Sequence, residues 1–174
     1  MAGSKAFQIV GFQNSGKTTL MKKMIFNGTK NGLRIGTIKH HGHGGVPEKT
    51  VLNKDTDKHR DAGAQITSVE GNGSLHIEAN KNSWDLEEII HVYKNFSMDL
   101  ILIEGYKHAS YPKVVIIRND DDLYLLEKLV NIKAVISWVP ITSHNAYEIF
   151  LIDDLDLFVK VFYKGIFENL EVVP

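Results

Sequence analysis

The sequence contains no cysteine, which excludes disulfide bonds, thiolate metal sites and a cysteine nucleophile. It also lacks any apolar run approaching the roughly 20 residues that a membrane-spanning helix needs. The first residues, Met1–Ala6, lack the apolar core of a signal peptide. The formal net charge of −1 gives no sign of a nucleic-acid or acidic-membrane partner. We therefore expect a soluble, cytoplasmic protein that binds neither nucleic acid nor membrane.

Internal repeats and long linkers rich in Pro, Ser or Gly are absent as well. The 174 residues therefore predict a single domain, 1–174, with a sizeable core. Short β-branched runs alternate with helical patterns, which is typical of parallel βαβ units. Strands are expected at 7–10, 34–39, 100–103, 114–117, 134–137 and 148–152. Helices are expected at 18–30, 56–62, 84–95, 123–130 and 153–163.

One segment departs from this alternation. Residues 66–69 and 75–79 flank Gly71-Asn72-Gly73, a spacing typical of a β-hairpin. The expected fold class is therefore α/β, with a mostly parallel sheet, helices on both of its faces and an antiparallel hairpin near residues 66–79.

The most informative segment fills every fixed position of the phosphate-loop pattern G-x-x-x-x-G-K-[ST]; it reads Gly11-Phe12-Gln13-Asn14-Ser15-Gly16-Lys17-Thr18. Glycines allow the backbone to approach phosphates, and N–H groups at a helix start bind anions. A β-branched strand directly before the motif and an amphipathic helix directly after it supply the required context. The sequence therefore predicts a three-layer sandwich of the P-loop NTPase type that binds a nucleoside triphosphate. The expected nucleotide contacts in this loop are Gly11, Gln13, Asn14, Ser15, Gly16, Lys17, Thr18 and Thr19.

Residues of the loop and of two further strand ends are expected to bind the phosphates and the metal ion. In the loop itself, Lys17 should reach the β- and γ-phosphates and the Thr18 hydroxyl should ligate Mg²⁺. Glu104 ends the apolar run 100–103, the place where P-loop proteins carry a second acidic group for the metal; a surface carboxylate is the alternative. Lys39 and His40 end an earlier strand, where open α/β sheets bind ligands, and are predicted to contact the nucleotide.

The remaining polar clusters predict less specific chemistry. His40, His41 and His43, with His59 and His108, allow a transition-metal site, although solvated or phosphate-bonded histidines are the commoner outcome. The run Asp120-Asp121-Asp122 is typical of a solvated turn that caps a helix.

The tryptophans and arginines do not identify a further functional site from the sequence. Trp84 and Trp138 are more typical of packing than of stacking on a base, although the loop near 137–143 is the expected base-contacting region. The only arginines are Arg34, Arg60 and Arg118, and none is assigned a catalytic role. Catalytic residues therefore stay unknown.

The sequence resembles the molybdopterin-guanine dinucleotide biosynthesis protein B family, MobB, from the first strand to Ile117-Arg118. The segments that carry the resemblance are Gly11–Leu20, Gly36–His40, Lys54–Thr56, His59-Arg60, Ala62–Ala64, Asp99–Lys107 and Pro112-Lys113. Gly36–His40 and Glu104–Lys107 are far more specific than the phosphate loop. The last third matches only in its strand–helix pattern.

This resemblance implies GTP binding with slow, Mg²⁺-dependent hydrolysis, a homodimer, and an adaptor role. The implied partner is the molybdenum cofactor guanylyltransferase, which attaches GMP to molybdopterin, and contact with molybdopterin itself is also implied. Asp55 is carried over as a switch or Mg²⁺-linked residue, while a helix N-cap is an equally good interpretation. Residues 42–49 depart from the acidic, aromatic stretch that the family usually has there.

Two other classes remain open: a P-loop metallochaperone GTPase and a P-loop small-molecule kinase. A metallochaperone needs a dedicated metal site, which only the histidines at 40–43 could supply. A kinase usually closes an arginine-rich lid over the phosphates, and three scattered arginines do not form one.

Overall fold

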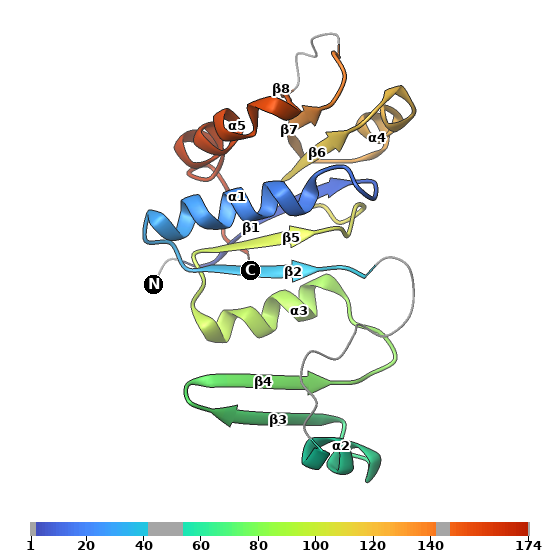
Figure 1. Ribbon diagram of the computed structural model, residues 1–174, viewed down its shortest axis with the longest axis vertical. Helices are drawn as coiled ribbons and strands as arrows, with labels where there is room; N and C mark the ends of the chain where they lie inside the picture. Colours follow the sequence, from blue (N-terminus) through green and yellow to red (C-terminus); the bar gives the residue numbers. More distant parts are fainter. Residues whose placement is uncertain (1–2, 42–53, 142–146, 174) are drawn as a thin grey trace. The chain divides into compact units, whose positions relative to one another are not determined.

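The computed structural model describes residues 3–41, 54–141 and 147–173. The chain divides into two compact units, one formed by Met1–Gly42 with Leu86–Pro174 and the other by His43–Asp85. Figure 1 shows the elements of both. The expectation of a single domain, 1–174, stays a prediction.

The first unit contains a six-stranded, all-parallel sheet in the order β2-β5-β1-β6-β7-β8 (Figure 1). The strands are β1 (Lys5–Gly11), β2 (Ile35–Lys39), β5 (Leu100–Glu104), β6 (Lys113–Ile117), β7 (Ile132–Ser137) and β8 (Glu148–Leu151). The central strands read as continuous apolar runs because both faces of the sheet are covered, and residues 100–103 are fully buried. The predicted parallel sheet is confirmed.

Helices cover both faces of this sheet, because alternate strand residues point to opposite sides. Phe7 and Ile9 of β1 pack in one cluster with residues of α1 (Lys17–Lys30) and α5 (Leu155–Val161). Ile101 and Ile103 of β5 pack in a second cluster with α3 (Leu86–Tyr93), and β6 packs in a third with α4 (Tyr124–Lys128). The three-layer P-loop architecture is therefore confirmed.

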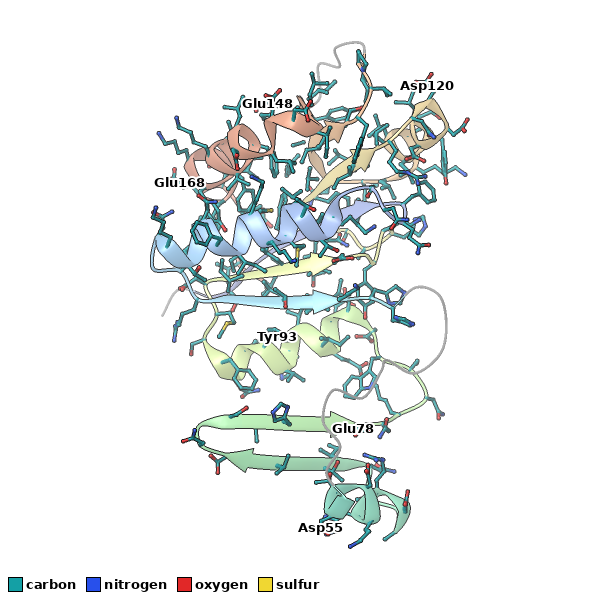
Figure 2. All side chains as sticks on the ribbon, in the orientation of Figure 1. Asp55, Glu78, Tyr93, Asp120, Glu148 and Glu168 are labelled. Atoms are coloured by element: carbon teal, nitrogen blue, oxygen red, sulfur yellow. The ribbon has the colours of Figure 1, made fainter. Side chains whose placement is uncertain are left out.

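The second unit holds a short helix and the predicted hairpin. Its elements are α2 (Lys54–Asp61), β3 (Ile66–Gly71) and β4 (Ser74–Ala79), and β3 pairs with β4 antiparallel. Asn72 and Gly73 have φ of 51° and 78°, as a two-residue turn between strands requires. Arg60 of α2 forms ion pairs with Asp57 and, at 2.6 Å, with Glu78 of β4, which ties the helix to the hairpin (Figure 2).

Element boundaries differ from the sequence prediction mainly at helix ends. The helix expected at 84–95 is shorter and ends in a 3₁₀ turn, Lys94–Phe96. The last helix begins at Leu155 and ends with the π-helical residues Phe162–Ile166, close to the stop expected near Gly165. Asp99 directly precedes β5, at the opposite end of the strand from Glu104. Its side chain accepts a hydrogen bond from the Arg34 backbone N–H at 2.7 Å, so it links two strand starts.

Candidate functional site

The phosphate loop joins β1 to α1 and depends on glycine at two positions. Gly16 has φ of 102° and Asn14 has φ of 58°, so the loop passes through the left-handed region twice. A Cβ atom on Gly11 would lie 2.7 Å from Ser15 Oγ, closer than real atoms approach. The Ser15 hydroxyl is buried and has no hydrogen-bond partner among the residues that the structure describes. The loop therefore needs glycine at position 16 for its backbone conformation and at position 11 for the close approach of Ser15.

A cavity of about 540 Å³ opens over this loop, a volume within the range of ligand-binding clefts. It is lined by Gln13, Asn14, Ser15, Gly16, Lys17, Thr18, Thr19, Lys39, Glu104 and Trp138. The structure thus brings together nine residues that the sequence predicted for the nucleotide and metal sites. Gly11 and His40 lie next to this set without lining the cavity, and the ligand roles of all of them stay predictions.

Lys17 folds back over the loop that it follows. Its Nζ atom donates a hydrogen bond to the Phe12 carbonyl oxygen at 2.6 Å. This contact holds the ammonium group above the loop, where backbone N–H groups and the start of α1 already favour an anion.

The charge around Lys17 is predominantly positive. Burial lowers its pKa below the ordinary value, Glu104 raises it, and the nearby Lys107, Lys39 and Arg118 lower it further. Burial is the largest cause of this shift, and the three cations that act on Lys17 outnumber the one carboxylate that does, Glu104. An anionic group placed there would relieve this repulsion, so the electrostatics favour a phosphate-bearing ligand.

Two side chains that line the cavity, Thr18 and Glu104, carry oxygen atoms of the kind that bind magnesium. Glu104 and Lys39 are register partners on β5 and β2, and the Lys39 Nζ atom lies 3.9 Å from Glu104 Oε1. The Glu104 side chain is only 13% exposed, and Thr18 lines the same cavity. Hydroxyl and carboxylate oxygens are the donors that Mg²⁺ takes together with water and substrate phosphates. Thr18 and Glu104 are therefore suited to hold it.

His40 is fixed beside Glu104 by backbone and ring contacts. Its N–H donates to the Glu104 carbonyl oxygen at 2.9 Å, and its ring packs on Tyr106 with 4.4 Å between centroids. Gly105 has φ of 96°, and a Cβ there would lie 3.0 Å from His40 Cβ, so glycine permits this close approach. The role of His40 as a nucleotide contact stays a prediction.

Other predicted metal residues are separated between the two units. Asp55 belongs to α2 of the second unit, where its carboxylate accepts a hydrogen bond from Lys58 at 3.1 Å (Figure 2). His59 belongs to the same unit, while His43 and the divergent residues 42–49 lie outside the described residues. Within residues 3–41, 54–141 and 147–173, no group of three or more His, Asp or Glu side chains is arranged to hold a metal ion. The metal role of Asp55 stays a prediction.

Sequence reasoning missed a pair that supports the loop from β6. Arg118 donates to the Gln13 carbonyl oxygen at 3.1 Å and to Asp122 Oδ2 at 3.0 Å, and its guanidinium lies 5.6 Å from the Phe12 ring centroid. Asp122 is only 3% exposed, so the expectation of a solvated run at 120–122 was wrong for this residue. Burial raises the pKa of Asp122, but the hydrogen bonds from Arg118 together with the positive charges of Arg118 and Lys107 lower it, and the net shift is downward.

Trp138 was also assigned to packing, yet it lines the cavity. Its indole Nε1–H donates to the Ser15 carbonyl oxygen at 2.9 Å, and 52% of the residue is exposed. The available signal was its position directly after a buried strand, at the edge where ligands bind. The expected base-contacting segment, 137–143, is described only as far as residue 141.

Comparisons with known proteins agree with the fold and the loop. A family model described as "Molybdopterin guanine dinucleotide synthesis protein B" matches residues 6–138. The chain is 45% identical over 149 residues to the probable molybdopterin-guanine dinucleotide biosynthesis adapter protein of Bacillus subtilis (strain 168), covering 84% of this chain and 85% of the relative. The Escherichia coli (strain K12) molybdopterin-guanine dinucleotide biosynthesis adapter protein is 35% identical over 150 residues, covering 81% and 84%.

The chain is also similar in fold to solved structures. The crystal structure of Bacillus subtilis MobB superposes with a TM-score of 0.78 at 40% identity, covering 92% of this chain and 96% of that one. The family model covers well over half of the chain, and the similarity extends through both sequence and fold. This chain therefore belongs to the MobB family of molybdopterin guanine dinucleotide synthesis proteins.

Proposed function

We propose that this protein is a GTP-binding adapter in the biosynthesis of the molybdopterin guanine dinucleotide form of the molybdenum cofactor. The observation that carries the proposal is the cavity over a complete phosphate loop, in which Lys17 lies among a surplus of positive charge. The adapter role is supported by the names of relatives at 45% and 35% identity. Its partner is the guanylyltransferase that attaches GMP to molybdopterin, and molybdopterin is a second candidate ligand.

The chemistry at the loop is positioning rather than fast turnover. Magnesium, held by Thr18 and Glu104, would neutralise charge on the phosphates, while Lys17 and the loop N–H groups bind and orient them. Arg118 is already bonded to Asp122 and to the Gln13 carbonyl oxygen, so we expect it to hold the loop rather than act on the reacting phosphates. Any GTP hydrolysis is therefore slow, and the bound state is what a partner reads.

The proposal also covers the location and the oligomeric state of the protein. No helix within the described part of the chain is both long enough and apolar enough to cross a bilayer. We propose that the protein works in the cytoplasm as a homodimer.

Titration with GTP and ATP, each with and without Mg²⁺, tests the nucleotide part of this proposal. We expect micromolar or tighter binding of GTP, strengthened by Mg²⁺, and weaker binding of ATP. Guanine preference depends on the family resemblance alone, so ATP binding as tight as GTP binding would reject it. Co-purification tests the adapter part: a guanylyltransferase retained with this chain, and lost without it, is the expected result.

A further inference from the structure

The two ends of the cavity differ in chemistry. At one end lie Lys39 and Glu104, from β2 and β5 on one side of β1. At the other end lies Trp138, which follows β7 on the opposite side of β1. A nucleoside triphosphate has the same polarity, because one end is a metal-binding polyphosphate and the other a planar, mostly apolar base.

Trp138 is held in place without being buried. Its indole Nε1–H donates to the Ser15 carbonyl oxygen at 2.9 Å, and its backbone N–H donates to the Ile117 carbonyl oxygen at 2.9 Å. These bonds fix the ring by its nitrogen edge, while 52% of the residue stays exposed. A tryptophan fixed at its polar edge with ring surface left free is well suited to stack on a planar ligand.

The end of the neighbouring strand β8 places an apolar side chain beside the phosphate loop. The Ile152 Cδ1 atom, directly after β8, lies 3.5 Å from where a Cβ of Gly16 would stand. The ends of β7 and β8 therefore border the phosphate loop on the side away from Glu104.

We propose that Trp138 forms the base-binding wall of the site and stacks on the base of the bound nucleotide. This assignment rests on the proposed nucleotide function. With Lys17 and Glu104 at the polyphosphate and its metal, the nucleoside has to extend toward β7 and β8. Stacking does not distinguish guanine from adenine, since every base has a π-face, so Trp138 supplies affinity for a nucleoside rather than for one base.

Fluorescence of Trp138 provides the direct test, with Trp84→Phe as the background so that Trp138 is the only indole. MgGTP and inorganic tripolyphosphate with Mg²⁺ are titrated separately into this variant. We expect both to bind, but only GTP to change the emission strongly, because tripolyphosphate has no base. An equal change with both ligands would overturn the assignment, since the indole would then report only on the phosphate loop.

Substitutions separate stacking from loop support. Trp138→Leu is expected to weaken GTP binding about 10-fold, the size of one base–aromatic contact, and to leave tripolyphosphate binding unchanged. Trp138→Phe keeps the ring, loses the bond to Ser15, and should stay within about 3-fold of the parent for both ligands. Phe26→Leu, at an exposed aromatic of α1, is the matched control and should change neither.

Failure of the Trp138 assignment can be distinguished from failure of the proposed nucleotide function. Equal weakening of both ligands by Trp138→Leu would make Trp138 a loop-positioning residue and overturn the assignment, as would no effect on GTP. If the unmodified protein bound neither ligand, or if Lys17→Ala left both affinities unchanged, the nucleotide function itself would be rejected and the assignment with it.

Discussion

The phosphate loop and the three side chains that surround it are assembled in different ways. Within the loop, residues 11–18, the contacts are local, and Lys17 bonds to a carbonyl only five positions away. The surrounding side chains Glu104, Arg118 and Trp138, here termed the distant supports, lie at or directly after the ends of β5, β6 and β7. Arg118 bonds to Gln13 across 105 positions and Trp138 to Ser15 across 123. The loop can be predicted from the spacing of its residues in the sequence, whereas the positions of the distant supports depend on the order of strands in the sheet.

That difference predicts different consequences of mutation. Local loop residues should change affinity without changing stability, because they face the cavity. Among the distant supports, we expect Arg118 to act on stability and loop position, Glu104 on metal dependence and Trp138 on affinity for the nucleoside. Three substitutions test this division and a fourth tests a buried lysine elsewhere in the sheet, in order of decreasing effect.

Lys17→Ala tests the loop and should have the largest effect. It removes the ammonium group that lies among Lys39, Lys107 and Arg118, so we expect at least about 100-fold weaker GTP binding, measured by calorimetry. The melting temperature should stay within a few degrees or rise, because a repelled charge is lost. Lys22→Ala, on the exposed side of α1, is the control and should bind normally. Normal affinity in Lys17→Ala would mean that the loop is not the nucleotide site.

Asp122→Ala tests the support from β6. The Asp122 carboxylate accepts bonds from the backbone and side chain of Arg118, so its removal should lower the free energy of unfolding by about 2–3 kcal/mol in urea denaturation. Asp120→Ala, at an exposed side chain of the same turn, is the control and should cost less than about 0.5 kcal/mol (Figure 2). Similar losses for both would contradict the structural distinction between them.

Asp122 also shows where sequence reasoning reached its limit. Parallel strands, the hairpin and the loop were all predictable, because each has a local pattern of period, turn or spacing. Three consecutive aspartates look equivalent in sequence, and only the fold buries the third one against Arg118. In the same way, Trp138 became a cavity residue only when β7 was placed two strands from β1. Glu104 was predictable because it ends a strand that is apolar at every position.

Lys113 begins β6, at the strand end opposite the phosphate loop, and its buried side chain can be tested through pH. The side chain is fully buried, and its Nζ atom donates to the carbonyl oxygens of Ala109 at 2.8 Å and Val130 at 2.6 Å. Burial lowers the pKa of Lys113 to about 8 from an ordinary 10.5. Between these values the unfolded chain binds more protons than the folded one, so stability should rise with pH, by about 2 kcal/mol from pH 8 to 10.5.

The control for Lys113 isolates this contribution from other titrating groups. Lys113→Met should lose the rise between pH 8 and 10.5, whereas Lys133→Met, at an exposed position of β7, should keep it. Urea denaturation at several pH values measures both. A wild-type stability that falls over this interval relative to Lys113→Met would contradict a neutralised, buried lysine.

Glu104→Gln tests the one distant support that is expected to act through the metal, and its effect should be the smallest. The amide keeps the shape of the side chain but removes the negative charge, so Mg²⁺ should strengthen GTP binding about 10-fold less than in the parent. Binding without Mg²⁺ should be unchanged or slightly tighter, because Lys39 and Lys17 lose a competing carboxylate. Glu168→Gln, at an exposed carboxylate far along the chain, should leave the Mg²⁺ effect intact (Figure 2). If Glu104→Gln weakened binding equally with and without Mg²⁺, Glu104 would support the loop in the same way as Arg118 does, and the metal site would have to be sought elsewhere.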